Sequence, residues 1–185
     1  MTSPVRPVDL DVAAQAPVGV VLALGSNLGD RAATLRSAVA MLRDVDGLLD
    51  LRVSPVFETP PVGGPEQGPY LNAVVAGRTT LAPRAVLGAA QRVEAAHGRE
   101  RVVRWGPRTL DVDVIAVGDL VSSDAELTLP HPRARERGFV LVPWAVVDPA
   151  AVLPGAHGGP VAELATAAAD SAQVRRTDDD LEAAP

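Results

Sequence analysis

Cysteine and lysine are both absent from this chain of 185 residues. The absence of cysteine excludes disulfides, thiolate catalysis and Cys-ligated zinc. The absence of lysine excludes the phosphate-binding lysines of P-loop enzymes and protein kinases, and every Schiff-base mechanism. All 17 basic residues are therefore arginines. Codon bias in a GC-rich genome would also produce this, but the exclusions hold either way, so any phosphate chemistry must use Arg, backbone amides and metal ions.

Aromatic residues are also scarce, and the net charge is negative. Aromatic residues make up only 3% of the chain, so the core must consist mostly of Val, Leu and Ala. The net charge of −6 argues against general nucleic-acid binding. We see no long apolar run that would predict a membrane span, and no apolar signal core at the N-terminus. We therefore expect a cytoplasmic monomer with small-molecule substrates and neither nucleic acid nor membrane as a partner.

The length and the apolar content of 47% are typical of one domain with a sizeable core. We expect residues 1–17 to be a flexible N-terminal extension and residues 18–169 to form the domain. Residues 170–185 carry five acidic residues and two arginines, and we expect them to be an acidic flexible tail.

The hydrophobic pattern predicts alternating strands and helices. Strands are expected at 19–24, 49–57, 70–80 and 109–117, and helices at 31–42 and 83–97, with Leu35, Val39, Leu42, Val86, Leu87, Ala90 and Val93 facing the core. Residues 59–69 are too rich in Pro and Gly for either and predict a long loop. A short strand near 126–129, a basic turn at 133–137, an apolar stretch at 139–147 and an Ala-rich helix near 161–169 follow. The order βαββαβ predicts an α+β fold, a ferredoxin-like sandwich with an antiparallel sheet, two helices on one side and short C-terminal additions.

Asp111 and Asp113 carry the strongest chemical signal. On a strand both carboxylates point to the same face, with Cα atoms about 7 Å apart, while Val112 packs on the other face. Mg²⁺ would relieve their repulsion, because it binds carboxylate oxygens and keeps water and substrate phosphates as its other ligands. Two ions about 3.5–4 Å apart could bridge such a pair. The alternative is a solvent-facing edge strand on which the pattern occurs by chance.

A basic loop precedes these two acids. Residues 98–108 hold four arginines and one Glu, and forked guanidinium groups bind phosphate esters. Together the two features favour a metal-assisted phosphate site over a solvated loop. Residues 25–30 are interpreted as a tight turn, and Gln91 and Glu94 as surface polar residues. For His131 a structural role and a hydrogen bond to phosphate stay equally open.

The segment RWGPRTLDVD, residues 104–113, resembles the signature of the 6-hydroxymethyl-7,8-dihydropterin pyrophosphokinase family. Further segments follow in that family's order: GSNLGD (25–30), TPPVGGPEQGPYLNAV (59–74), QRVE (91–94), GR (98–99), LPH (129–131) and RGF (137–139). The resemblance covers roughly residues 18–155. It implies a ferredoxin-like fold and an ATP-dependent diphosphokinase of folate biosynthesis. Such an enzyme moves the pyrophosphoryl group of ATP to the pterin hydroxymethyl group and leaves AMP.

The resemblance also implies a set of site residues. Asp111 and Asp113 would hold two Mg²⁺ ions with ATP as co-substrate, and Arg99 and Arg108 resemble the family's mobile and fixed catalytic arginines. The implied ATP-binding residues are Gln91, Glu94, Arg99, Arg101, Trp105, Arg108, Val114, Thr128, His131 and Arg137. The implied pterin-binding residues are Thr59, Pro60, Val62, Tyr70, Asn72, Trp105, Asp111 and Phe139, among which Tyr70 and Phe139 match the stacking pair. Pro132 and Glu126 depart from the family, which often has Tyr and a basic residue there.

Two other interpretations use the same residues. A catalytically silent pterin- or nucleotide-binding module could keep the fold, but the retained aspartates and arginines argue against it. A nucleotidyl- or glycosyltransferase with an Asp-x-Asp motif would not need the Pro/Gly loop. An assay for AMP release distinguishes the silent binding module from an active enzyme. Replacing the pterin with another acceptor would reveal a nucleotidyl- or glycosyltransferase.

Overall fold

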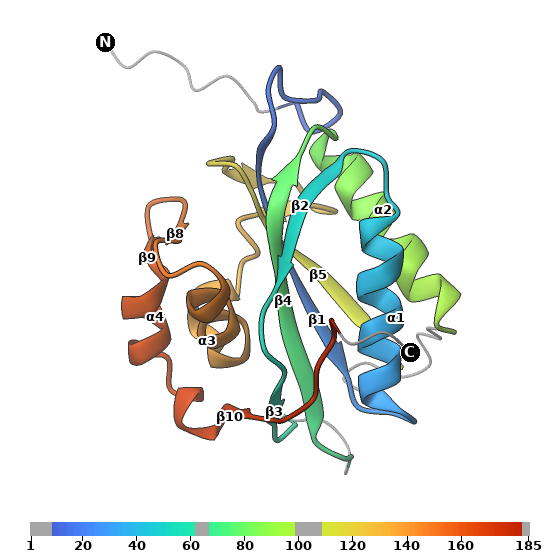
Figure 1. The fold of residues 1–185 in the computed structure, drawn as a ribbon. Helices are drawn as coiled ribbons and strands as arrows, with labels where there is room; N and C mark the ends of the chain where they lie inside the picture. Colours follow the sequence, from blue (N-terminus) through green and yellow to red (C-terminus); the bar gives the residue numbers. More distant parts are fainter. Residues whose placement is uncertain (1–8, 62–66, 99–108, 183–185) are drawn as a thin grey trace.

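A central antiparallel sheet organises the fold (Figure 1). The computed structural model describes residues 9–61, 67–98 and 109–182. The strands lie in the order β10-β3-β4-β1-β5, and β2 also pairs with β4. Their bounds are β1 Val18–Ser26, β2 Leu48–Val53, β3 Phe57–Thr59, β4 Tyr70–Thr79, β5 Asp111–Val117 and β10 Arg175–Arg176. With β2 and β3 sharing one edge of β4, this is a ferredoxin-like strand order, so the predicted fold class is confirmed.

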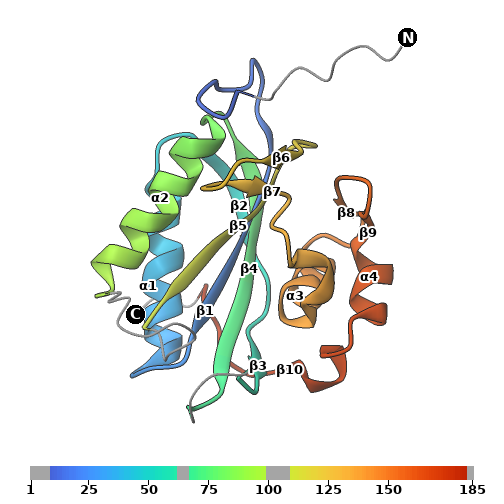
Figure 2. The same cartoon turned by 180° about the vertical axis from the view of Figure 1, so that it is seen from behind.

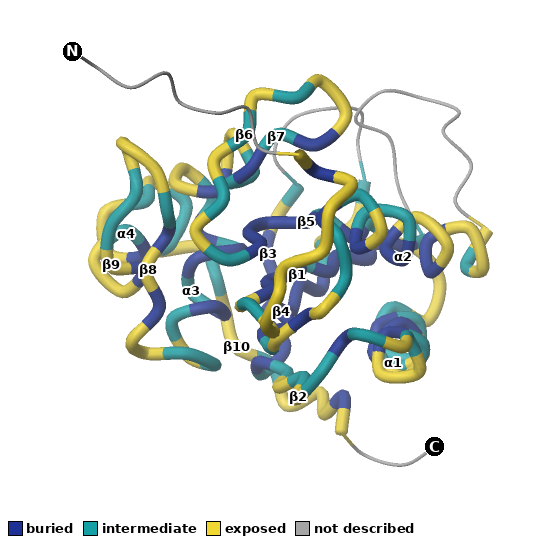
Figure 3. Tube along the Cα trace, turned by 90° about the horizontal axis from the view of Figure 1, so that it is seen from above, coloured by how far each residue is buried: buried dark blue, intermediate teal, exposed yellow. Residues whose placement is uncertain are grey.

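Helices α1 (Arg31–Arg43) and α2 (Pro83–Ala96) cover one face of the sheet (Figure 1). α1 begins after Asp30, whose side chain accepts a hydrogen bond from the Ala33 N–H at 3.0 Å. α2 ends before Gly98, whose φ of +68° suits glycine. The predicted core residues of both helices are buried, apart from the partly buried Leu87. Figure 3 shows this buried layer between the helices and the sheet.

A third layer covers the opposite face of the sheet (Figure 2). It consists of α3 (Gly138–Val147) and α4 (Val161–Ala167), and it encloses a second apolar cluster. α3 was not predicted, because Pro143 lies inside it and removes a helical hydrogen bond. Val140, Leu141 and Trp144 are nevertheless buried, so tertiary packing overrides the local preference.

Smaller elements connect these layers. They are β6 (Ser122–Ser123), β7 (Thr128–Leu129), β8 (Val152–Leu153), β9 (Gly159–Pro160) and the 3-10 turns η1 (Ala134–Glu136) and η2 (Ser171–Gln173). β7 and η1 fall where a short strand and a basic turn were predicted. Among the described residues, no helix is long and apolar enough to cross a membrane.

The strand predicted at 49–57 is divided into β2 and β3. Asp50 has a φ of +53°, and the pairing of β2 with β4 shifts register beside it. Pro55 cannot donate to a ladder. Ser54 instead pairs with Val74 through its backbone N–H and its Oγ, each at 2.9 Å. The chain therefore stays beside β4 but resumes as a separate strand.

The described parts of both predicted extensions, residues 9–17 and 170–182, contact the domain. Leu10 is 4% exposed, and its carbonyl accepts a hydrogen bond from the Arg84 N–H at 3.0 Å. At the other end β10 pairs with β3, and Leu181 is 4% exposed. Glu182 forms an ion pair with Arg43 of α1 at 2.6 Å. An isolated Leu in a polar segment gave too weak a signal to predict this docking.

Candidate active site

β5 presents Asp111 and Asp113 on the sheet face that α3 covers. Both side chains are half-buried, while Val112 and Val114 are buried in the cluster under α1 and α2. The predicted shared face of the two carboxylates is therefore confirmed. The pairing of β5 with β1 shifts register after this point, so Ile115 and Ala116 both pack in the second cluster. Such a bulge re-phases a strand beside a functional site.

Two basic side chains reach Asp113 from the segment before α3. Arg137 Nη1 lies 3.0 Å from Asp113 Oδ2, and His131 Nε2 lies 3.8 Å from the same oxygen. The Arg137 side chain is 17% exposed and that of His131 is 20% exposed, so both side chains are largely shielded from water. The Arg137 guanidinium also lies over the Phe139 ring, 5.4 Å from its centroid. One acidic oxygen, two donors and one aromatic face thus meet in one place.

The hydrogen bonds of His131 fix its tautomer. Its Nδ1 accepts a hydrogen bond from the Arg133 N–H at 3.2 Å, so the ring proton is on Nε2, the atom nearest Asp113. Burial lowers the pKa of His131, and the attraction of Asp113 offsets this only in part. His131 is therefore a neutral donor at pH 7, directed at the carboxylate. Both the structural role and a hydrogen bond to phosphate are compatible with this geometry.

A row of residues crosses the sheet beside Asp111. Asn72 of β4 pairs with Gly25 of β1, and Gly25 pairs with Asp111 of β5. Residues paired across strands point to the same face, and neighbouring strands lie about 4.8 Å apart. Since Gly25 has no side chain, Asn72 and Asp111 flank a bare piece of backbone two strand spacings wide.

The polar atoms of this row are oriented. The Asn72 amide donates to Thr59 Oγ1 at 2.9 Å, and both residues are buried. A Cβ added at Gly25 would lie 3.3 Å from Asn72 Oδ1 and 3.7 Å from Tyr70 Cδ1. The Asn72 carbonyl and the edge of the Tyr70 ring therefore border the bare backbone. An acceptor beside an aromatic ring suits a flat ligand with N–H groups on its edge.

Glu94 of α2 supports β5 from the opposite face. Its Oε1 accepts a hydrogen bond from the Val112 N–H at 2.8 Å, and the residue is 5% exposed. Val112 lies between the two aspartates, so Glu94 fixes the backbone that carries them. The default interpretation of Glu94 as a surface residue is wrong, whereas Gln91 is exposed as expected.

Replacement of Glu94 by Ala is expected to lower the free energy of unfolding by about 1–3 kcal/mol, because the buried Val112 N–H loses its acceptor. Glu94→Gln keeps an acceptor oxygen and should lose much less. Denaturant unfolding of both variants measures the difference, with Arg92→Ala, an exposed change on the same helix, as the control. Equal stability of Glu94→Ala and Arg92→Ala would contradict this role.

The remaining predicted residues are either in contact with neighbouring residues, limited to a backbone or surface role, or outside the described residues. Phe139 is partly buried against the second cluster, and Thr128 Oγ1 donates to the Asp124 carbonyl at 2.9 Å. Val114 has its side chain in the core, so only its backbone could meet a ligand, and Pro60 is exposed. Five predicted residues lie outside the described residues: Val62, Arg99, Arg101, Trp105 and Arg108.

The carboxylate pair suits a metal that completes its coordination with other ligands. Within the described ranges, no cluster of three or more His, Asp or Glu side chains could hold a metal ion. Two carboxylates on one strand fit Mg²⁺, which binds one or two carboxylates together with phosphates and water. They do not fit a closed structural zinc site.

Sequence reasoning missed two residues, one in the row and one beside it. Gly25 was assigned to a turn, although its pairing with Asn72 and Asp111 makes it part of the sheet. Asn27 is 7% exposed, and its side chain donates to Gln67 Oε1 at 2.9 Å. That bond ties the end of β1 to the Pro/Gly loop. A Gly and an Asn in a Gly-rich turn carry no local signal of such long-range contacts.

Comparison with protein families places this geometry in a known context. The family model described as 7,8-dihydro-6-hydroxymethylpterin-pyrophosphokinase (HPPK) matches residues 21–149, more than half of the chain. The 2-amino-4-hydroxy-6-hydroxymethyldihydropteridine pyrophosphokinase of Mycobacterium tuberculosis is 47% identical over 180 residues, covering 88% of this chain and 92% of the relative. The protein of the same name from Methylorubrum extorquens is 43% identical over 157 residues, covering 85% of this chain and 97% of the relative.

Solved structures show the same fold at much lower identity. The Plasmodium falciparum HPPK-DHPS wild type with STZ-DHP is 12% identical and superposes with a TM-score of 0.65. The match covers 86% of this chain and 45% of that structure, so this chain spans less than half of the longer protein.

Proposed function

This chain belongs to the 7,8-dihydro-6-hydroxymethylpterin-pyrophosphokinase family, and we propose that the Asn72–Gly25–Asp111 row binds the pterin beside a metal-bound triphosphate at Asp113. The chain is an ATP-dependent enzyme that transfers a pyrophosphoryl group from ATP to 6-hydroxymethyl-7,8-dihydropterin in folate biosynthesis. The observation that supports the location is the glycine between Asn72 and Asp111. It leaves room for a flat ring next to a carboxylate.

The two ends of the row would hold different parts of the pterin. At the Asn72 end, a carbonyl oxygen fixed by Thr59 would accept from the N–H groups of the ring edge. The Tyr70 and Phe139 rings would bind its faces, with Pro60 and Val62 at its rim. At the Asp111 end, the hydroxymethyl oxygen would come close to the carboxylates and to the triphosphate. The row therefore orders the acceptor oxygen relative to the phosphate that it attacks.

Asp111 and Asp113 would hold two Mg²⁺ ions, which supply charge neutralisation for the triphosphate and the attacking oxygen. Arg137 lies 3.0 Å from Asp113 and would orient that carboxylate while its other guanidinium N–H groups meet phosphate oxygens. His131 would donate a hydrogen bond from its Nε2–H to the same phosphates. Since none of these groups is a strong base, catalysis would rest on positioning and electrostatics.

The other predicted contacts belong to the same proposal. Arg99 and Arg108 would be the mobile and fixed catalytic arginines, with Arg101 and Trp105 beside the nucleotide. Gln91 would contact the triphosphate, whereas Thr128 and the backbone of Val114 would border the nucleoside, near the end of α2 that carries Glu94. We also propose a monomer in the cytoplasm, because both substrates are small molecules and the reaction requires neither nucleic acid nor a membrane.

Tyr70→Ala and Phe139→Ala test the pterin end directly. Each is expected to weaken pterin binding by about 1–3 kcal/mol, the scale of stacking one base on an aromatic ring, while the affinity for ATP changes little. Calorimetric titration of each variant with a pterin analogue and with a non-hydrolysable ATP analogue measures both affinities. Unchanged pterin affinity, or equal loss for both ligands, would mean that these rings support the fold and do not bind the pterin.

A further inference from the structure

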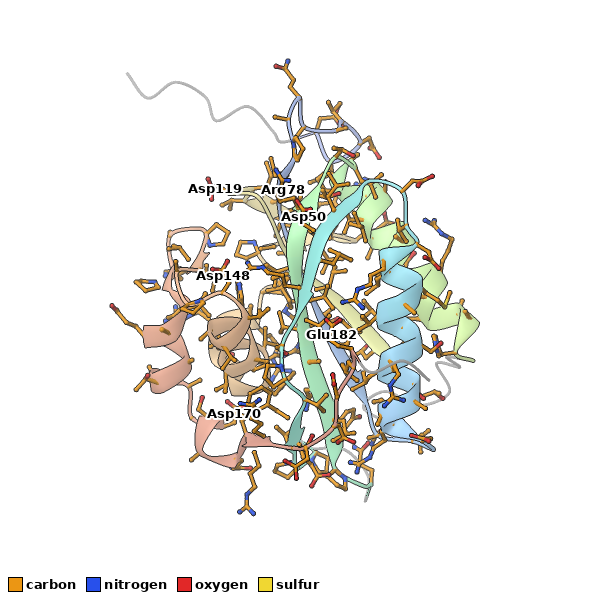
Figure 4. The ribbon with its side chains drawn as sticks, viewed as in Figure 1. Asp50, Arg78, Asp119, Asp148, Asp170 and Glu182 are labelled. Atoms are coloured by element: carbon orange, nitrogen blue, oxygen red, sulfur yellow. The ribbon has the colours of Figure 1, made fainter. Side chains whose placement is uncertain are left out.

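Asp170 caps the first turn of α3 from a distant part of the sequence (Figure 4). The residue before the helix, Arg137, makes no side-chain capping bond of its own. Asp170 Oδ1 instead accepts a hydrogen bond from the Gly138 N–H at 2.6 Å. A carboxylate at a helix N-terminus is stabilised by the free N–H groups and by the helix dipole. The first N–H of α3 is therefore satisfied by a carboxylate from the C-terminal segment.

The contact leaves no room for adjustment at Gly138. A Cβ added there would lie 2.5 Å from Ser171 Oγ and 2.7 Å from Asp170 Oδ1. Real Cβ atoms do not approach other atoms so closely, so glycine is required for the helix to meet Asp170. Gly138 thus lies between two residues of the site, Arg137 and Phe139, and is in close contact with Asp170 and Ser171 of the C-terminal segment.

Asp170 is itself held in place on both sides. Ser171 Oγ donates to the Ala165 carbonyl of α4 at 2.6 Å, and the Gln173 N–H donates to the Asp170 carbonyl at 2.9 Å. The chain then enters β10, which pairs with β3. The carboxylate therefore lies on a turn that α4 and the sheet hold in place, and its hydrogen bond to Gly138 positions the start of α3 relative to that turn.

We propose that Asp170 is a positioning residue for the transfer reaction. By holding Gly138, it sets Arg137 at 3.0 Å from Asp113 and keeps the Phe139 ring under the same guanidinium at 5.4 Å. Asp170 acts through these two neighbours and touches neither substrate. The proposal rests on the roles proposed above for Arg137 and Phe139. It gives the segment expected to be a loose acidic tail a part in organising the site.

The test compares Asp170→Ala and Asp170→Asn with a matched change at the other end of the same helix. Asp148 follows α3 and forms an ion pair with Arg52 at 3.7 Å, so Asp148→Ala also removes a carboxylate beside α3 (Figure 4). In full-length protein, below the unfolding temperature of each variant, Asp170→Ala should lower kcat/KM about tenfold or more, the scale of one charge-assisted hydrogen bond. Asp170→Asn, which keeps the shape and loses the charge, should fall between, and Asp148→Ala should leave kcat/KM unchanged.

A double-mutant cycle with Arg137→Ala separates positioning from general destabilisation. If Asp170 acts through Arg137, adding Asp170→Ala to Arg137→Ala should lower turnover much less than it does in the wild type. The proposal would be overturned if Asp170→Ala lowered turnover by the same factor in the Arg137→Ala and Phe139→Ala backgrounds as in the wild type. Wild-type kcat/KM in folded Asp170→Asn and Asp170→Ala would also overturn it. If Arg137→Ala and Phe139→Ala themselves leave kinetics unchanged, the proposed site is wrong and the positioning role is wrong with it. If they impair turnover and Asp170→Ala matches Asp148→Ala, only the positioning role is overturned.

Discussion

Replacing Asp111 or Asp113 with Ala is expected to lower turnover by about a hundredfold to a thousandfold, the usual cost of removing one preorganised electrostatic group from a transition state. Each carboxylate supplies metal ligands, and its loss leaves phosphate charge uncompensated while the pyrophosphoryl group moves. The fold should survive, because both side chains are only half-buried and β5 packs through its apolar residues, Val112 and Val114 to Val117. The deficit should therefore appear in turnover and in Mg²⁺ dependence, and not in the circular dichroism spectrum.

Turnover measured against Mg²⁺ concentration distinguishes a binding defect from a catalytic one. Asp119→Ala is the matched control, because Asp119 is an exposed aspartate just after the other end of β5 (Figure 4). It should keep wild-type kinetics at every Mg²⁺ concentration. If either Asp111→Ala or Asp113→Ala kept near-normal turnover at saturating Mg²⁺, the metal assignment would be wrong.

The parts of this molecule that could be predicted are those encoded by neighbouring residues. Asp30 caps α1 and Gly98 ends α2, as the local sequence indicates. The alternation of Asp111, Val112 and Asp113 predicted correctly which side chains share a face, because the period of a strand is fixed by backbone geometry. The assignment of strands and helices in the order βαββαβ was then sufficient for the fold class.

The parts that could not be predicted depend on contacts between distant residues. Glu94 looks like a surface residue on a helix, and only the docking of α2 on β5 brings its carboxylate to the Val112 N–H. Asp170 looks like part of a tail, and only the packing of α4 on α3 brings it to Gly138. α3 forms despite Pro143, because burial of its apolar side chains outweighs one missing hydrogen bond.

Gly25 also depends on contacts between distant residues, and its replacement is expected to have the largest effect on pterin binding. Gly25→Val should weaken pterin binding by about a hundredfold, the combined scale of one lost stacking contact and one lost hydrogen bond. The new Cβ would lie 3.3 Å from Asn72 Oδ1 and 3.7 Å from the Tyr70 ring, and the two methyl groups would extend over the backbone that the pterin is proposed to cover. ATP binding should change little, because Arg137 and His131 approach Asp113 from another segment.

Gly19→Val is the control that makes this result specific. Gly19 lies on the same strand and, being six residues away, on the same face as Gly25, yet a Cβ there meets nothing within 4 Å. Valine is favoured in strands, so this variant should fold at least as well as the wild type and bind both ligands normally. Calorimetric titration with a pterin analogue compares the two variants directly. Normal pterin affinity in a folded Gly25→Val protein would place the pterin elsewhere, whereas equal weakening in both variants would show that any side chain on this face of β1 disturbs the sheet.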